Sequence, residues 1–384
     1  MHHGLSNGDV EASIVSAWPM VLCTNRDAGN DIQTVAGQNG VGRCDRVSPI
    51  GFTIDLCFFL LQCLSSQTMK TASPIKPPRL RRGDLIGIVS PSSPVAEAQR
   101  IERGVRYLES LGYRVIVGEH VGSTFGYLAG TDEERAADLH AMFANKNVRA
   151  IVCVRGGYGT TRLLSLIDYR LIARNPKILV GFSDVTALQL ALWRKCRLVT
   201  FHGPMAAVEM ANTMHPYTEE MFWRCITSSK ALGELHLPEQ PIVLSTASRA
   251  ATGRLLGGNL SLVVSLLGTS YAPVFDRAVL FLEEIAEEPY RVDRMLTHLR
   301  NASAFNDAVA MLFGDFTDCV PSDTSKPSFR IDDVLQEVAR EFGKPALARV
   351  PFGHVPRKLT LPIGIRVRID TRRPSIALLE SAVA

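Results

Sequence analysis

The chain has 384 residues, of which 46% are hydrophobic and 21% are charged, and its formal net charge is +4. That length and composition allow two globular domains, each with its own core. Positive and negative residues are interspersed, and the longest basic cluster is the short segment RLRR at residues 79–82. This pattern argues against a nucleic acid as the main partner, because a phosphate-binding face usually carries a concentrated basic stripe.

The first part of the chain differs from everything that follows. Residues 1–68 show no sustained helical or strand periodicity, and their one apolar run, residues 50–64, is interrupted by Asp55. That run is shorter than the roughly 20 residues that a membrane span needs, and it lies too far from Met1 to be the core of a signal peptide. We therefore expect residues 1–78 to be a disordered extension of a cytoplasmic protein without a membrane partner.

The eight cysteines show no spacing typical of a metal site. Four lie in the first 63 residues (Cys23, Cys44, Cys57 and Cys63), and four are scattered singly in apolar surroundings (Cys153, Cys196, Cys225 and Cys319). No C-x-x-C motif occurs among them. We expect buried, reduced thiols rather than disulfides or a zinc site.

Strands and helices alternate clearly from residue 83 onward. The segments DLIGIVSPSSP, YRVIVGEHV, VRAIVCVRGGYG and PKILVGFSD each contain an apolar strand, and amphipathic helices are predicted at residues 96–111 and 131–144. Strands separated by helix-length segments predict parallel βαβ units. Residues 79–230 should therefore form a Rossmann-like N-terminal domain with an open, doubly wound parallel sheet, whose ligands bind at the carboxyl ends of the strands.

The second half is also of the α/β class. A Pro-rich passage near residues 229–250 leads to a smaller C-terminal α/β domain at residues 250–384. Within it we predict a helix in GRLLGGNLSLVVSLLGT, entered through the paired glycines, strands in AVLFLEEI and AVAMLFGDF, and a helix at residues 290–299. Short strands should flank the segments PFGHVPRKLTLPIG and IRVRID near the C-terminus.

Ser183 is a candidate nucleophile. In KILVGFSDVTALQL, residues 177–190, an apolar strand breaks at Gly181 and places this hydroxyl at the start of a helix. A hydroxyl on such a tight turn projects toward the ligand crevice, where the helix N-terminus favours negative charge. The alternative is that Ser183 or Asp184 only caps the helix. The G-x-S-x-G elbow of α/β-hydrolases is incomplete, because Val185 stands where its last glycine would be.

A second glycine turn, VRGGYGTTRLL, follows the neighbouring strand. Its backbone N–H groups are suited to a phosphate, but the spacing matches neither common phosphate-binding motif. Together with a serine nucleophile, the same turn is suited to an oxyanion hole, with the backbone N–H groups of Gly157 and Asp184 as donors. Arg155, beside this turn, either binds the carboxylate of a substrate or braces the turn.

A hydroxyl nucleophile needs a base, and the base needs a group that orients it. His202 and His354 both follow apolar segments and precede Gly or Pro turns, so both are candidates for the base. Glu283 and Glu284 lie at the end of an apolar strand, where a carboxylate is costly unless it is paired.

Strand alternation sends Glu283 and Glu284 to opposite faces. We expect one of them in the crevice and the other solvated or paired with Arg291 or Arg294.

Seven motifs in one order resemble the LD-carboxypeptidase family of serine peptidases, which includes the microcin-immunity enzymes. The match runs from about residue 83 almost to the C-terminus. The motifs are GYLAGTDEERAADL, RGGYG, GFSDVTAL, HGPM, GRLLGGNLSLV, LFLEEIAEEPYRVDRML and GHVPRKLTLPIG.

The resemblance implies a Ser-Glu-His triad of Ser183, Glu283 and His354. The family usually has Glu-Asp where this chain has Glu283-Glu284, so the choice between the two glutamates is the least certain assignment. The resemblance also implies an active site between the two domains, a homodimer, and no metal or organic cofactor. The implied reaction is hydrolysis of the amide between an L-centre, diaminopimelate or lysine, and the terminal D-alanine of a cell-wall tetrapeptide.

Two other functions stay open. A related peptidase that hydrolyses an aminoacyl-nucleotide antibiotic would share the triad and differ only in its substrate pocket. His202 in the HGPM segment favours the cell-wall enzyme. A non-catalytic α/β protein that binds an anion at the RGGYG turn would form no covalent serine adduct.

Overall fold

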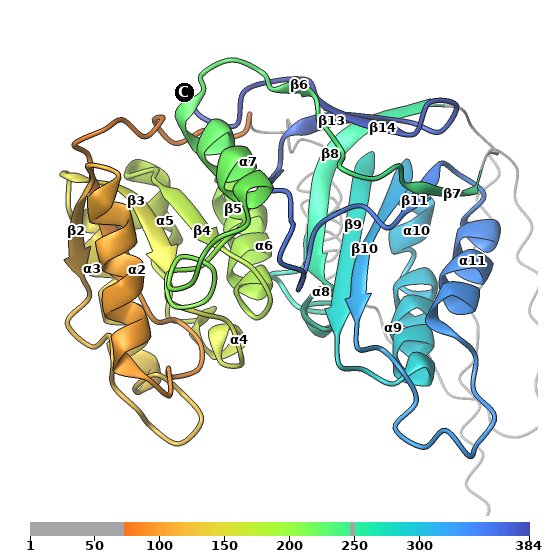
Figure 1. Cartoon of the computed structure of the whole chain (residues 1–384), viewed down its shortest axis with the longest axis horizontal. Helices are drawn as coiled ribbons and strands as arrows, with labels where there is room; N and C mark the ends of the chain where they lie inside the picture. Colours follow the sequence, from red (N-terminus) through yellow and green to blue (C-terminus); the bar gives the residue numbers. More distant parts are fainter. Residues whose placement is uncertain (1–72, 246–249) are drawn as a thin grey trace, which may run out of the picture. The chain divides into compact units, whose positions relative to one another are not determined.

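The computed structural model describes residues 73–245 and 250–384, and these residues belong to one compact unit. Two sheets make up this unit (Figure 1). The apolar run at residues 50–64 and the four N-terminal cysteines lie outside the described residues. Cys153, Cys196, Cys225 and Cys319 are free thiols, and all but Cys196 are buried.

The N-terminal sheet has six strands in the order β12-β5-β4-β3-β1-β2. Its first five strands in the sequence all pair in parallel. They are β1 (Leu85–Val89), β2 (Arg114–Val117), β3 (Val148–Cys153), β4 (Ile178–Gly181) and β5 (Thr200–His202). This sheet confirms the predicted open parallel fold.

Helices cover both faces of this sheet. Buried side chains of α2 and α7 pack on one face, and those of α3, α5 and α6 pack on the other. The helices are α2 (Ala98–Ser110), α3 (Asp132–Ala144), α4 (Thr160–Leu163), α5 (Tyr169–Arg174), α6 (Val185–Cys196) and α7 (Pro216–Thr227). Strand β4 is buried along its whole length, as expected of a parallel strand covered on both faces.

The sixth strand comes from the far end of the chain. β12 (Leu361–Ile363) pairs antiparallel with β5, with Leu361 opposite His202. The sequence predicts the strands near PFGHVPRKLTLPIG as part of the C-terminal domain, but β12 pairs with the N-terminal sheet. The segment that carries His354 therefore ends in the sheet of the N-terminal half.

The second sheet has eight strands in the order β6-β14-β13-β8-β9-β10-β11-β7. Its centre, from β8 to β11, is parallel, and the outer strands are antiparallel. The strands are β6 (Gly233–Glu234), β7 (Ile242–Ser245), β8 (Ala250–Asn259), β9 (Ala278–Ile285), β10 (Ala310–Thr317), β11 (Ala346–Ala348), β13 (Arg366–Asp370) and β14 (Ser375–Leu378). The helices are α8 (Leu260–Ser265), α9 (Pro289–Asn301), α10 (Ala304–Asp307) and α11 (Ile331–Phe342).

The predicted helix in GRLLGGNLSLVVSLLGT is wrong for its first half. Strand β8 continues through both glycines, because its ladder to β9 places Gly257 opposite Phe281 and Gly258 opposite Leu282. Helix α8 begins only at Leu260, where the side chain of Asn259 accepts a hydrogen bond from the backbone N–H of Leu262.

Helix α6 connects the two sheets. It belongs to the N-terminal half but also packs against α8 and β8 of the C-terminal half. Buried side chains from both halves consequently form one continuous core, in which Leu188 and Leu192 of α6 join Leu256 of β8 and Val263 of α8.

Residues 73–78, part of the extension that we expected, contact the folded chain. The backbone N–H of Ile75 donates to the carbonyl of Arg197 (2.9 Å), and the backbone N–H of Ala384 donates to the carbonyl of Pro77 (2.9 Å). Lys76 pairs with Glu380 at 2.9 Å. Among the helices of the described residues, none combines the length and the apolar composition that a membrane crossing requires.

Candidate active site

Ser183 lies on a strained turn between β4 and α6. Its φ is 62°, in the left-handed region, where a residue other than glycine costs about 1–3 kcal/mol. The side chain of Asp184, which stands at the N-cap of α6, makes no capping hydrogen bond. Local capping therefore does not explain this backbone, and strain of this kind is typical of functional sites.

The glycine turn after β3 lies directly beside Ser183. A Cβ atom on Gly156 would stand 2.8 Å from the Cβ of Ser183, so the close approach requires glycine. The backbone N–H of Thr160, after the turn, donates to Asp184 Oδ2 (2.9 Å), which ties the turn to the start of α6. Neither Gly157 N–H nor Asp184 N–H makes a hydrogen bond within the described part of the chain.

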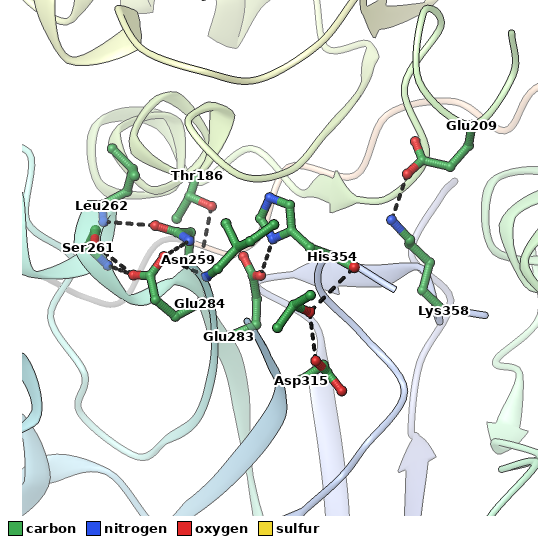
Figure 2. Close-up of polar contacts among 12 residues, drawn as sticks. Thr186, Glu209, Asn259, Ser261, Leu262, Glu283, Glu284, Asp315, His354 and Lys358 are labelled. Atoms are coloured by element: carbon green, nitrogen blue, oxygen red, sulfur yellow. Dashed lines mark hydrogen bonds and ion pairs between the residues drawn. The ribbon is translucent and has the colours of Figure 1, made fainter. Parts of the chain in front are cut away.

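His354 and Glu283 form a direct pair (Figure 2). His354 Nδ1 lies 2.7 Å from Glu283 Oε2, and the two side chains are 17% and 0% exposed. Burial raises the pKa of Glu283, and the hydrogen bond and charge of His354 oppose that shift. An ionised Glu283 only accepts hydrogen bonds, so in that state Nδ1 carries the proton and Nε2 is left as the basic nitrogen.

A glycine also allows the close contact between the His354 loop and Glu283. Gly353 has φ 104°, and a Cβ atom there would stand 2.8 Å from Glu283 Oε2. The loop can therefore bring His354 onto the buried carboxylate only with glycine at this position.

Ser183 and His354 line the same pocket of about 370 Å³. Its wall includes Gly156, Gly157 and Arg155, all from the glycine turn. A larger pocket of 610 Å³, near Tyr290 and Phe329, contains none of the candidate catalytic residues. The structure thus gathers the serine, the histidine and the glycine turn around one hollow.

Two family models match the chain. The model of the LD-carboxypeptidase N-terminal domain matches residues 86–203, and that of the LD-carboxypeptidase C-terminal domain matches residues 252–369. The chain belongs to the LD-carboxypeptidase family. This confirms the recognition made from the motifs and the enzyme class that it implied, a serine-type carboxypeptidase hydrolase.

Individual relatives agree with the family. The chain is 36% identical over 310 residues to the probable murein peptide carboxypeptidase of Bacillus subtilis strain 168, covering 80% of this chain and 95% of the relative. Its fold is similar to muramoyltetrapeptide carboxypeptidase from Oxalobacter formigenes, with TM-score 0.67, 28% identity, and 77% and 97% of the two chains covered. It is also similar to the wild-type apo structure of the microcin C7 self-immunity protein MccF, with TM-score 0.74, 28% identity, and 81% and 100% covered.

The second glutamate of the LD-carboxypeptidase chain lies elsewhere than expected. Glu284 is neither solvated nor paired with Arg291 or Arg294, because β9 is buried on both faces and Glu284 is only 3% exposed. Its carboxylate instead accepts hydrogen bonds from Asn259 Nδ2 (2.7 Å), Ser261 Oγ (2.6 Å) and Ser261 N–H (2.8 Å). Glu284 therefore holds the start of α8 (Figure 2).

Sequence reasoning missed the contact that joins the two halves at this point. The backbone N–H of Asn259 donates to Thr186 Oγ1 (3.1 Å), and Thr186 lies in the first turn of α6, after the serine. The C-terminal half therefore holds the helix that carries Ser183. No sequence pattern predicts this pair, because Thr186 is recognisable from the sequence only as part of a helix.

His202, the other candidate base, lies behind the pocket wall. It is fully buried, and its ring stands 5.5 Å from that of Phe182, which does line the pocket. Burial, and then the charges of Lys358 and His354, hold the pKa of His202 well below its usual value. His202 is therefore a neutral ring in the core, and of the two histidines only His354 reaches the pocket.

Two arginines line the pocket. Arg155 donates through Nε to the carbonyl of Gly156 (3.1 Å), so it braces the turn as well as facing the hollow. Arg100, which the sequence did not single out, donates through Nε to the carbonyl of Ala207 (2.8 Å). The sequence did contain a signal for Arg100. It lies in the first turn of α2, the helix that follows β1, and ligands of parallel sheets bind near the carboxyl ends of the strands.

Proposed function

We propose that this LD-carboxypeptidase hydrolyses the amide between an L-centre, diaminopimelate or lysine, and the terminal D-alanine of murein tetrapeptides. The observation that carries the proposal is the shared pocket of Ser183 and His354, with Glu283 bound behind the imidazole. The names of the relatives, a murein peptide carboxypeptidase and a muramoyltetrapeptide carboxypeptidase, support the same substrate.

The proposed mechanism uses groups of the chain and one water. His354 Nε2 accepts the proton of Ser183 Oγ, which attacks the scissile carbonyl, and Glu283 stabilises the imidazolium. The N–H groups of Gly157 and Asp184 donate to the oxyanion, and the imidazolium then protonates the leaving amine of D-alanine. Water, deprotonated by His354, finally releases the tripeptide from Ser183.

A carboxypeptidase must recognise a terminal carboxylate. Arg155 and Arg100 both face the pocket, and each guanidinium keeps further N–H donors, although Arg155 Nη1 also donates to the carbonyl of Pro94 (3.4 Å). We assign the carboxylate of D-alanine to these two cations, since a planar guanidinium suits a bidentate carboxylate contact.

A second candidate substrate is an aminoacyl-nucleotide antibiotic. The structure of the microcin C7 self-immunity protein MccF matches with the higher TM-score, 0.74 against 0.67 for the muramoyltetrapeptide carboxypeptidase. Because the proposed chemistry is the same in both cases, only the substrate distinguishes the two functions.

The test compares wild-type protein with Ser183→Ala on two substrates, a murein tetrapeptide and an aminoacyl-nucleotide analogue. We expect conversion of tetrapeptide to tripeptide by the wild type, loss of at least about 10³-fold of that rate in Ser183→Ala, and a fluorophosphonate adduct on Ser183. Equal tetrapeptide turnover by Ser183→Ala would refute the nucleophile. Preference for the nucleotide analogue would favour the antibiotic, and the absence of an adduct and of any turnover would favour an anion-binding protein.

We also propose that the protein acts in the cytoplasm as a homodimer and without a nucleic-acid partner. The interspersed charges of the sequence support the last point, and the family resemblance supports the dimer.

A further inference from the structure

A buried ion pair joins the two halves of the chain beside the pocket. Lys358 Nζ lies 2.6 Å from Glu209 Oε1, and the two side chains are 3% and 11% exposed. Figure 2 shows the pair to the right of His354 in that view. Taking two opposite charges out of water is costly, so a pair at this depth is weak evidence for stability and points to another role.

Both partners belong to segments that build the pocket. Lys358 follows His354 on one loop, and its backbone N–H donates to Thr218 Oγ1 at the start of α7 (2.8 Å). Glu209 Oε2 accepts a hydrogen bond from the backbone N–H of Met205 (2.9 Å), and Met205 lines the pocket. The ion pair therefore ties the His354 loop to a pocket wall that comes from the N-terminal half.

The ammonium group also contacts the residue before Ser183. Lys358 Nζ stands 4.0 Å from the centroid of the Phe182 ring, within the range of a cation–π contact. The same ring meets the imidazole of His354 edge-to-face, with centroids 5.0 Å apart. Phe182 is thus in contact with the proposed base and covalently joined to the proposed nucleophile.

Substitution of the ion pair by a neutral pair would not reproduce these contacts. An apolar side chain fills the volume, but it attracts neither the Glu209 carboxylate nor the face of the Phe182 ring. His202, which also stands against this ring, is neutral and cannot replace the cation.

We infer that Lys358 is a positioning residue for the reaction: paired with Glu209, it holds Phe182 and the His354 loop so that the imidazole stays within reach of the Ser183 hydroxyl. The inference rests on the proposed roles of Ser183 and His354. A displacement of reacting groups by ~1 Å can cost about 10²-fold in rate, so a small loosening of this contact is measurable.

The experiment compares Lys358→Met, Lys358→Arg, and the double variant Lys358→Met/Glu209→Gln in the full-length protein. Three quantities are measured for each: the thermal midpoint, kcat and KM on a murein tetrapeptide, and the rate of fluorophosphonate labelling at Ser183. Gln at position 209 keeps an acceptor for the N–H of Met205 and leaves no unpaired buried charge. Lys177→Met is the matched control, because Lys177 is also buried (5% exposed) and precedes β4, at the end opposite Ser183.

For Lys358→Met we expect kcat and the labelling rate to fall at least about tenfold with KM within about threefold, and Lys358→Arg to recover most of that loss. The double variant should regain thermal stability but stay slow, whereas Lys177→Met should lose stability and keep its kcat. Activity that returns together with stability in the double variant would show a purely structural role and overturn the inference. A wild type that neither turns over the peptide nor labels at Ser183 would instead overturn the proposed function and the inference with it.

Discussion

Two adjacent glutamates with different partners show how environment assigns a role to a carboxylate. Glu283 touches the imidazole of His354, whereas Glu284 is surrounded by the N–H and hydroxyl donors of α8. The sequence predicts a catalytic glutamate in this pair but cannot choose the member, because both stand at the end of the same apolar strand. The choice depends on Asn259 and Ser261. These residues lie at the start of α8, and a loop separates that helix from β9.

Glu283→Gln tests that assignment. The amide donates a hydrogen bond where the carboxylate accepted one, so it favours the imidazole tautomer that lacks a lone pair on Nε2. We expect kcat to fall by about 10³–10⁴-fold, as in other triads whose acid is replaced by its amide. Steady-state kinetics measure this loss of kcat, and circular dichroism checks that the variant is folded. Glu284→Gln is the matched control, and a larger loss of kcat there than in Glu283→Gln would reverse the assignment.

The elements that position the site could be predicted where the hydrophobic periodicity extends over many residues. The parallel strands and the helices α2, α3 and α9 follow from periodicity and glycine turns. Two elements did not follow. The glycines of β8 read as the entry to a helix, and β12, with only three residues and a proline, carries no pattern of its own. Both are determined by pairing with strands distant in the sequence.

Helix α3 supports the glycine turn through a buried arginine. Arg135 is 2% exposed and donates through Nη1 to the carbonyls of Gly159 (3.1 Å) and Pro91 (2.5 Å), while its other end pairs with Asp132. From the sequence, the segment that contains Arg135, GYLAGTDEERAADL, predicts only an amphipathic helix. The turn beside Ser183 thus depends on a side chain from another element.

Arg135→Leu should therefore damage both stability and catalysis. The two carbonyls lose their donor, and each unsatisfied buried acceptor costs about 1–3 kcal/mol. We expect a lower free energy of unfolding in urea and a lower kcat for the fraction that remains folded. Arg162→Leu is the control, since Arg162 also pairs with Asp132 but its side chain is 42% exposed. Equal losses of stability and full activity in both variants would contradict the role of Arg135 in supporting the glycine turn.

The two halves of the folded chain are linked at several points. β12 crosses into the N-terminal sheet, α6 packs on the C-terminal half, Thr186 binds Asn259, and Pro77 and Arg79 bind the last residue. From sequence alone the halves read as separate domains with boundaries at residues 79, 230 and 250, which stay predictions. Contacts between residues more than a hundred positions apart, such as Glu209 with Lys358, leave no local signature.

Because of these links we expect one cooperative unfolding transition. Calorimetry should give a calorimetric enthalpy equal to the van't Hoff enthalpy, the criterion for a two-state process. Two resolved transitions, one for each sheet, would show instead that the halves unfold independently. Pro362→Gly, in the β12 strand, should leave a single transition at a lower temperature if the shared strand contributes to the cooperativity.

The left-handed backbone of Ser183 has a consequence for how this protein can be improved. Glycine would relax that conformation and raise stability, yet it would remove the hydroxyl that the proposed reaction needs. Selection for thermal robustness alone would therefore drive this position away from catalysis. A library screened only by heating should accumulate glycine at position 183, and the surviving variants would be thermostable but inactive.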